Sequence, residues 1–268
     1  VYKRQVFADA SVSQEEVNLA LSALLNSENA LTIKEEAKYT LQDFTFEGSK
    51  ITGFSASGKD KFEYNKDLLI PETNADGEAI TEIADSAFEN TKSDYIIRTD
   101  TGYSPSGLDS VVIPETVKRI GAKAFKYNKI KEVKLPELAH IIQKRAFENN
   151  ELESLLLGKY TGHIGDYAFA GNKLSELLIY GEIEEIGKAA FMNNRLKEVK
   201  IMPKPKERKH GLERIEELTF AENMLTTITP PPTVSYIHST AFNKNAYGQV
   251  SVITVSYTHL TLPTIYSG

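Results

Sequence analysis

Apolar residues recur along this chain with a period of 22 residues. Seven phenylalanines are separated by 37, 22, 22, 22, 29 and 22 residues: Phe88, Phe125, Phe147, Phe169, Phe191, Phe220 and Phe242. An isoleucine stands five residues before each of them, at Ile83, Ile120, Ile142, Ile164, Ile186, Ile215 and Ile237. A fixed period of this length is typical of a solenoid, in which every repeat is one structural unit stacked on the next.

Each repeat also carries a short stretch in which apolar and polar residues alternate. The segment Glu132-Val133-Lys134-Leu135 is one example, and its alternation predicts a strand with Val133 and Leu135 facing the core. The residues seven, nine and eleven positions after each phenylalanine should then face outward together. A single repeat leaves its apolar side chains uncovered, whereas burial of each is worth roughly 1.5–3 kcal/mol. Neighbouring repeats must therefore stack, and the terminal ones need caps.

The segment around each phenylalanine predicts a second local element. In Ile164-Gly165-Asp166-Tyr167-Ala168-Phe169 and its equivalents, the apolar spacing indicates a short helical or 3₁₀ turn. Asparagine follows three residues after the phenylalanine, at Asn128, Asn150, Asn172, Asn194, Asn223 and Asn245. Asparagine tolerates the left-handed conformation that ends such a turn. We also expect its amide to bond backbone of the next coil, so that the asparagines form a ladder.

The repeat I-G-x-x-A-F-x-x-N-x-L-x-x-V-x-L-P resembles the BspA-like leucine-rich repeats of bacterial surface proteins, over about residues 78–252. The resemblance implies an α/β repeat solenoid with short parallel strands and short helical turns. It also implies a secreted or surface-anchored module for adhesion to a host or microbial protein or glycan, without catalysis. Glu216 and His238 replace the usual glycine, and Pro230 to Pro232 stand where a strand should end, which weakens the last two coils.

The chain divides into five predicted segments. Residues 78–254 are the repeats, residues 41–77 a degenerate first coil or β cap, and residues 6–40 a helical N-terminal segment. Residues 1–5 can be encoded by GTGTATAAGAGACAG, and residues 255–259 by GTCTCTTATACACAT, which overlaps its reverse complement. We therefore expect residues 1–5 and 255–268 to be translated sequencing adapter, with residues 6–254 a fragment of a longer gene.

A helix is predicted ahead of the repeats, over about residues 14–26. Ser13-Gln14-Glu15-Glu16 forms a capping box, and the apolar residues that follow share one helical face. This stretch is also similar to the closing helix of FIVAR-type helical surface modules. It is either the last helix of a preceding domain or a helical cap on the solenoid. Residues 41–70 predict short strands and turns.

The outward strand positions predict one contiguous apolar patch. Its members are Leu156, Leu178, Tyr180 and Met202, which fall nine or eleven residues after their phenylalanines. An exposed patch of this kind usually marks a partner site. The alternative is that the neighbouring insertion of residues 203–211 covers the patch.

Two insertions interrupt the period. The first lies in residues 92–107 and predicts a plain surface loop. The second centres on a basic segment with Lys204, Lys206, Arg208 and Lys209. On an acidic chain this basic segment is a candidate site for an anionic partner, and the alternative is an ordinary solvated loop.

The composition disfavours nucleic-acid binding and membrane insertion. The formal net charge is −6, and removing the two adapter cations Lys3 and Arg4 changes it to −8, which disfavours nucleic-acid binding. No apolar run approaches the roughly twenty residues that span a bilayer, so we expect no membrane insertion of this segment. The absence of cysteine fits an exported protein as well as many cytosolic ones.

Motifs of enzymes and metal sites are broken in this chain. Gly53 to Lys59 resembles a phosphate loop, but Asp60 replaces the required Ser or Thr, and we expect a turn. Residues 72–77 resemble the start of a calcium loop, but Ile83 replaces the bidentate glutamate, which predicts a hairpin or loop. His140 and His163 should lie in adjacent coils, without metal-ligand spacing. We expect no catalysis and no cofactor. A structural spacer or an intracellular interaction scaffold is the alternative to a surface adhesion module.

Overall fold

A computed structural model of the protein describes residues 38–90, 96–99, 102–105, 107–180, 182–203, 211–245 and 250–252. The chain divides into two compact units, Val1–Lys38 and Tyr39–Gly268, and almost all described residues belong to the second. The predicted helix over residues 14–26 lies outside the described residues.

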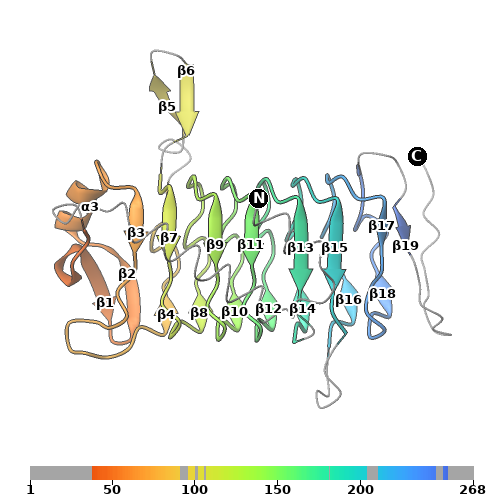
Figure 1. The fold of residues 1–268 in the computed structure, drawn as a ribbon, viewed down its shortest axis with the longest axis horizontal. Helices are drawn as coiled ribbons and strands as arrows, with labels where there is room; N and C mark the ends of the chain where they lie inside the picture. Colours follow the sequence, from red (N-terminus) through yellow and green to blue (C-terminus); the bar gives the residue numbers. More distant parts are fainter. Residues whose placement is uncertain are drawn as a thin grey trace, which may run out of the picture. The chain divides into compact units, whose positions relative to one another are not determined.

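The second unit is a solenoid of short parallel strands, which confirms the predicted repeat fold (Figure 1). One strand row consists of β4 (Glu82–Ile83), β8 (Arg119–Ile120), β10 (Ile141–Ile142), β12 (His163–Ile164), β14 (Glu185–Ile186), β16 (Arg214–Ile215) and β18 (Tyr236–Ile237). Strands β4 to β14 pair in parallel with the repeat isoleucines in register, so that Ile142 pairs with Ile120 and with Ile164. The predicted 22-residue period is therefore the period of strand stacking.

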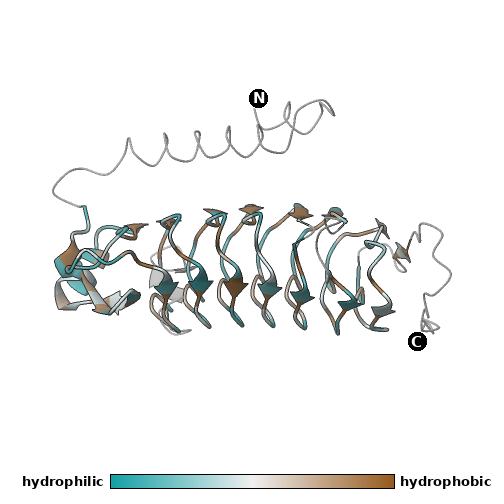
Figure 2. Ribbon diagram, turned by 90° about the horizontal axis from the view of Figure 1, so that it is seen from below, coloured by the Kyte–Doolittle hydropathy of each residue, from teal (hydrophilic) through white to brown (hydrophobic). Residues whose placement is uncertain are grey.

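The second strand row carries the alternating segments. It consists of β3 (Asp67–Leu69), β7 (Ser110–Val112), β9 (Glu132–Lys134), β11 (Ser154–Leu156), β13 (Glu176–Ile179), β15 (Glu198–Ile201), β17 (Thr227–Ile228) and β19 (Ser251–Val252). These strands pair in parallel as β3-β7, β9-β11, β13-β15 and β17-β19. Brown and teal segments recur at equivalent places in successive coils, as expected for one hydropathy pattern repeated along the stack (Figure 2).

The repeat phenylalanines form a continuous stack through the core. Successive ring centroids from Phe88 to Phe242 are 5.0 to 5.9 Å apart, and the rings are nearly parallel. Five of the seven rings, from Phe125 to Phe220, are completely buried. From Phe125 onward, the aliphatic positions eight and ten residues later are buried as well, with Leu155 and Val252 as the half-buried exceptions. The core is therefore assembled between coils, as the sequence pattern predicts.

The predicted short helical turns are wrong. The residues before each phenylalanine form hydrogen-bonded turns, and in every coil except the last the residue two positions before it has a positive φ, as in Lys123 (58°) and Tyr167 (57°). The N–H of Phe169 donates to the carbonyl oxygen of Ala190 in the next coil, at 2.8 Å. Backbone donors that a helix would use internally are thus used between coils, and this precludes helix formation.

The repeat glycine allows two coils to approach closely. A Cβ atom on Gly165 would lie 2.5 Å from the backbone nitrogen of Lys144, and one on Gly187 would lie 2.5 Å from that of Asp166. Glu216 replaces this glycine in the following coil. The continuous sheet ends at β14, and β16 pairs only with β18, as expected for a coil that cannot approach as closely.

The predicted asparagine ladder is confirmed, but its direction and backbone geometry differ from the prediction. Asn172 donates to the carbonyl oxygens of Phe169 in its own coil and Phe147 in the preceding coil, both at 3.0 Å. Its Oδ1 accepts from the N–H of Leu152, again in the preceding coil, at 3.0 Å. The left-handed residue is the one before the asparagine, for example Gly171 (φ 69°). Each asparagine therefore joins its coil to the preceding one, whereas we expected the next.

The N-terminal part of the second unit adds other elements to the stack. A 3₁₀ turn, η2 (Leu41–Asp43), precedes β1 (Phe44–Glu47), which pairs antiparallel with β2 (Lys50–Phe54), and β2 pairs in parallel with β4. The α-helix α3 (Ala56–Phe62) follows, with the hydroxyl of Ser55 accepting from the N–H of Gly58. The turn predicted over Gly53 to Lys59 is therefore partly a helix. Propensity alone did not indicate it, because a glycine lies in its first turn.

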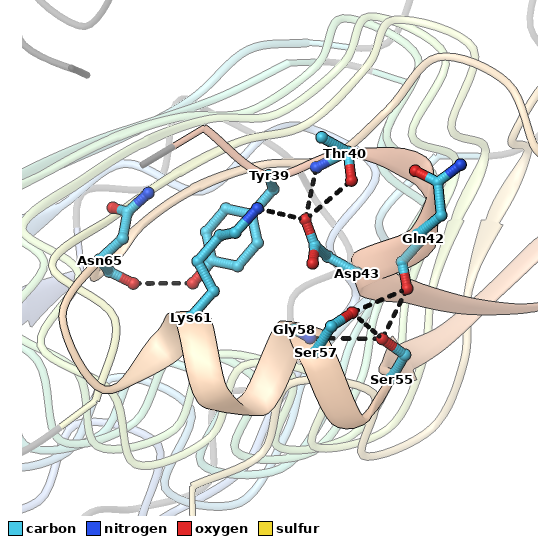
Figure 3. Close-up of polar contacts among 9 residues, drawn as sticks. All are labelled: Tyr39, Thr40, Gln42, Asp43, Ser55, Ser57, Gly58, Lys61 and Asn65. Atoms are coloured by element: carbon cyan, nitrogen blue, oxygen red, sulfur yellow. Dashed lines mark hydrogen bonds and ion pairs between the residues drawn. The ribbon is translucent and has the colours of Figure 1, made fainter. Parts of the chain in front are cut away.

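A buried polar cluster joins η2 to α3 (Figure 3). Asp43 is 3% exposed and accepts from Lys61 Nζ at 2.6 Å and from the Thr40 N–H at 2.7 Å. Burial alone would raise the pKa of Asp43, but the bonds from Lys61 and Thr40 outweigh it, so its pKa is lowered. The hydroxyl of Tyr39 donates to the Asn65 carbonyl oxygen at 2.7 Å, while burial and the Asp43 charge raise the pKa of Tyr39.

We expect Asp43→Asn to lower the free energy of unfolding by about 2 kcal/mol at pH 7, because it removes charge-assisted bonds from Lys61 and Thr40. The folded pKa of Asp43 lies below its unfolded value of about 3.9. The stabilisation is therefore present above about pH 4 and is lost as the pH falls below it. Urea unfolding from pH 7 to pH 2.5 should show the two proteins converging at low pH. The exposed Asp60→Asn in α3 is the control, and an equal pH profile for both variants would contradict the prediction.

The first insertion is a β-hairpin, so the predicted plain loop is wrong in its secondary structure. Strands β5 (Ile96–Thr99) and β6 (Gly102–Pro105) pair antiparallel, with Ile96 opposite Pro105. The hairpin projects from the chain just before β7 (Figure 1). In the sequence it lies between β3 and β7 of the second strand row, which also carries the predicted patch.

Candidate functional site

The outer face of the second strand row is the candidate binding surface. Within β13 and β15, Leu177 and Val199 are buried, while their neighbours Leu178 and Lys200 face outward. This alternation follows from the period-two geometry of strands. The residues nine positions after each phenylalanine consequently form one column across the coils.

The four predicted patch residues lie on three successive coils. Leu178 is opposite Lys200 in the β13-β15 register, and the N–H of Met202 donates to the Ile179 carbonyl oxygen at 2.8 Å. Leu156, at the end of β11, occupies the equivalent position one coil earlier, and β11 lies beside β13. Met202 is 46% exposed, whereas Leu156, Leu178 and Tyr180 are half-buried. The residues thus line one surface whose side chains are partly accessible to a partner.

Sequence reasoning missed other exposed apolar residues near this surface. Leu69, at 48% exposure, and the half-buried Val112 occupy the same column in β3 and β7. The insertion of residues 92–107 hid Val112, because it shifted the count from Phe88, while Leu69 lies ahead of the first repeat phenylalanine. Leu138 and Tyr160, at 47% and 40% exposure, follow the strands of two adjacent coils. Both stand thirteen residues after their phenylalanines, a position that the repeat comparison could have flagged.

Charges surround the apolar column unevenly. Lys134 pairs with Glu115 of the preceding coil at 2.6 Å, so its charge is compensated. Glu176 and Glu198 are directly opposite each other in the β13-β15 register, and both are exposed. Lys200 lies 3.1 Å from Glu198. The surface around Leu178 therefore carries excess negative charge.

His140 and His163 lie in adjacent coils, as expected. Their rings meet edge to face with centroids 5.3 Å apart, and His140 Nδ1 lies 2.9 Å from the Tyr160 carbonyl oxygen. His163 lies 3.4 Å from Glu185. A surface depression of about 330 Å³ is lined by Ile141, Ile142, Gln143, His163, Ile164, Gly165 and Glu185. In the described part of the chain, no three potential ligands converge on a metal position.

The segment that resembles a calcium loop is a small backbone-closed loop, as predicted. Asn74 Oδ1 accepts from the N–H groups of Asp76 and Glu78, both at 2.9 Å, and its amide donates to the Gly48 carbonyl oxygen. Thr73 and Ala79 form an antiparallel bridge. The Asn74 side chain is therefore used to hold the loop closed.

The basic segment with Lys204, Lys206, Arg208 and Lys209 lies outside the described residues, so it stays a prediction of the sequence. The alternative that the insertion of residues 203–211 covers the patch likewise stays a prediction of the sequence. Among the described residues, no helix is long and apolar enough to cross a membrane.

Comparison with known proteins identifies the repeat. The family model of the BspA type leucine rich repeat region matches six copies, over residues 97–210 and 206–261. No curated protein matches the sequence.

Three solved structures resemble the chain. The pneumococcal vaccine antigen PcpA is 23% identical with a TM-score of 0.46, and the match covers 78% of this chain and 45% of that one. A leucine-rich repeat protein from Bacteroides ovatus is 16% identical with a TM-score of 0.46, and the match covers 80% of this chain and 64% of that one. A leucine rich cell surface protein from Faecalibacterium prausnitzii is 19% identical with a TM-score of 0.50, and the match covers 81% of this chain and 54% of that one.

The match to the Faecalibacterium protein supports the solenoid fold alone, because its sequence identity is low. In each case the match spans less than two thirds of the solved chain. The family model covers more than half of the present sequence, and its repeats coincide with the stacked coils. The chain therefore belongs to the BspA-type leucine-rich repeat family.

Proposed function

We propose that this chain is a non-catalytic binding module on the outside of a bacterial cell, which adheres to a protein or glycan of a host or another microbe. The observation that carries the proposal is the partly exposed apolar surface of Leu156, Leu178, Tyr180 and Met202 on neighbouring coils. Exposed apolar groups gathered on one face are typical of interaction sites.

The rigidity of the coil stack supports a binding role. Asparagine bonds and stacked phenylalanine rings connect each coil to the preceding one, so the surface residues are held in fixed positions. Preorganised surfaces lose less conformational entropy on binding than mobile ones. A repeat array therefore suits a partner that contacts several coils at once.

Family membership and local geometry both favour a non-catalytic role. Leucine-rich repeat proteins are typically binding proteins, and the phosphate-loop-like residues Gly58 and Lys59 lie inside α3. Gly58 packs against the Asp43 backbone, since a Cβ atom there would lie 2.0 Å from its carbonyl oxygen. This glycine therefore has a packing role.

We expect Leu178→Asp to abolish adhesion while leaving the protein folded. Leu178 is half-buried on the outer strand face, so its replacement should change the free energy of unfolding by less than about 1.5 kcal/mol. A charge in the patch should weaken partner binding at least tenfold. Purified protein would be tested for retention on immobilised matrix proteins and glycans, with folding checked by urea unfolding.

Thr229→Asp is the matched control, because Thr229 is exposed in the same column beyond the patch. If Leu178→Asp failed to fold, the outward assignment of this position would be wrong. If it folded and bound as the wild type does, the patch would not be the adhesion site. A spacer or an intracellular scaffold would then become the better reading, and labelling of intact cells with an antibody would separate these two.

A further inference from the structure

The patch is bordered by a pair of carboxylates that the fold leaves facing each other. Glu176 and Glu198 are cross-strand neighbours in β13 and β15, two residues before Leu178 and Lys200 respectively. Like charges directly opposite each other on paired strands are destabilising. Their presence beside the patch therefore needs a compensating role.

Several carboxylates elsewhere in the stack are paired with cations of neighbouring coils. Lys173 lies 2.7 Å from Glu151, and Lys126 lies 2.6 Å from Glu148. By contrast, the Glu176 side chain has no hydrogen bond or ion pair with any described residue, and the Glu198 side chain pairs only with Lys200 of its own strand. The Glu176 carboxylate beside the patch thus remains available to an external cation, and Glu198 is paired only with the exposed Lys200.

The spacing of these groups matches an α-helix lying across the strands. The Phe147 and Phe169 rings of the two coils that carry Leu156 and Leu178 are 5.5 Å apart, so these leucines repeat along the stack at about the same spacing. Residues three or four positions apart on a helix rise about 4.5–6 Å, which brings successive apolar side chains over successive coils. Within β13, Glu176 and Leu178 are about 6.7 Å apart, less than the width of a helix.

We propose that this acidic-apolar face, formed by Glu176, Glu198, Leu156, Leu178, Tyr180 and Met202, docks a cationic amphipathic helix of a protein partner. The inference deepens the proposed function and rests on it. The apolar side of the helix covers Leu156, Leu178 and Met202. Lysine or arginine side chains along one edge of the helix reach Glu176 and Glu198.

The composition of the face favours a cationic helix over a glycan. Anionic glycans are repelled by Glu176 and Glu198, and the net charge of −6 adds to that repulsion. Tyr180 is the one aromatic side chain among the described residues of this face, which offers little stacking surface for neutral sugars. Charge complementarity beside an apolar stripe is the pattern of helix-in-groove recognition.

The test uses a synthetic 18-residue peptide with leucines on one helical face and lysines along its edge, titrated into the whole chain by fluorescence anisotropy. A scrambled peptide of the same composition and a leucine-glutamate peptide are the comparison probes. We expect the lysine peptide to bind at least tenfold more tightly than either, and salt should weaken its binding. The double variant Glu176→Gln with Glu198→Gln should lose at least tenfold in affinity for it.

A second double variant, Asp76→Asn with Glu213→Gln, changes the net charge equally at exposed positions on other parts of the molecule. It should bind the lysine peptide as the wild type does. An equal loss in both double variants, or equal binding of all three peptides, would overturn the helix proposal.

Absence of peptide binding would also overturn the helix proposal, and the adhesion assay then decides about the proposed function. If Leu178→Asp still abolished adhesion to a glycan or matrix protein, the adhesion function would stand without the helix. If Leu178→Asp changed nothing either, both proposals would fall together.

Discussion

Replacing Phe169 with alanine should lower the free energy of unfolding by about 3–5 kcal/mol, the largest effect that we expect of any single substitution. The ring is completely buried, and its centroid lies 5.5 Å from that of Phe147 and 5.4 Å from that of Phe191. Because backbone and asparagine bonds hold both neighbouring coils in place, the coils cannot close the cavity. The cost then includes the lost transfer free energy and the cavity.

Urea unfolding followed by circular dichroism would measure this change. Tyr64→Ala is the control, since Tyr64 is an aromatic residue with 69% exposure and its loss should cost less than about 0.5 kcal/mol. A loss below about 1 kcal/mol for Phe169→Ala would show that the coils do not depend on the ring stack. An array can also unfold in parts, so the transition should be checked with a second probe.

Asn172→Ala should cost about 3 kcal/mol, the second-largest effect. The substitution leaves the buried N–H of Leu152 without its acceptor, which costs about 1–3 kcal/mol. The carbonyl oxygens of Phe147 and Phe169 each lose one donor, but Asn150 and Asn194 still donate to them. The loss at these two carbonyls is therefore smaller than at Leu152.

The exposed Asn243 makes no side-chain hydrogen bond with described residues, so Asn243→Ala is the matched control, and it should change stability by less than about 0.5 kcal/mol. Hydrogen exchange would localise the effect, because the Leu152 amide should lose protection in Asn172→Ala and keep it in Asn243→Ala. Equal stability of the two variants would mean that the ladder contributes little beyond the apolar core.

The candidate binding face was predictable in part. The period-two rule assigned Leu156 and Leu178 to the outside of the strands. In the structure both are half-buried, and Leu178 alternates with the buried Leu177 and Ile179. The rule could not assign their exposure, since neighbouring side chains across the coils leave Leu178 half-buried and Met202 46% exposed. The register that opposes Glu176 and Glu198 follows from the 22-residue period. Only the structure shows that the Glu176 side chain has no ion pair or hydrogen bond with a described residue.

The helices show where local pattern was insufficient. The spacing of Ile164, Ala168 and Phe169 fits a helix and a turn equally well. The turn forms because the Phe169 N–H bonds to Ala190 in the next coil, a partner 21 residues away in the sequence. Conversely α3 was missed because Gly58 disfavours a helix locally, whereas the close approach of the Asp43 backbone requires glycine there.

The sequence by itself determined the repeat length, the alternating strand segment of each coil and the buried positions, whereas the second strand of each coil, which ends at the repeat isoleucine, was not predicted. Every coil repeats the same local environment, so the same residue types recur at the same positions, from Ile120 and Phe125 to Ile237 and Phe242. Only the tertiary structure decided the turn geometry, the direction of the asparagine bonds and the accessibility of the patch. Each of these depends on contacts between coils, and a single repeat read along the chain does not contain the groups that make them.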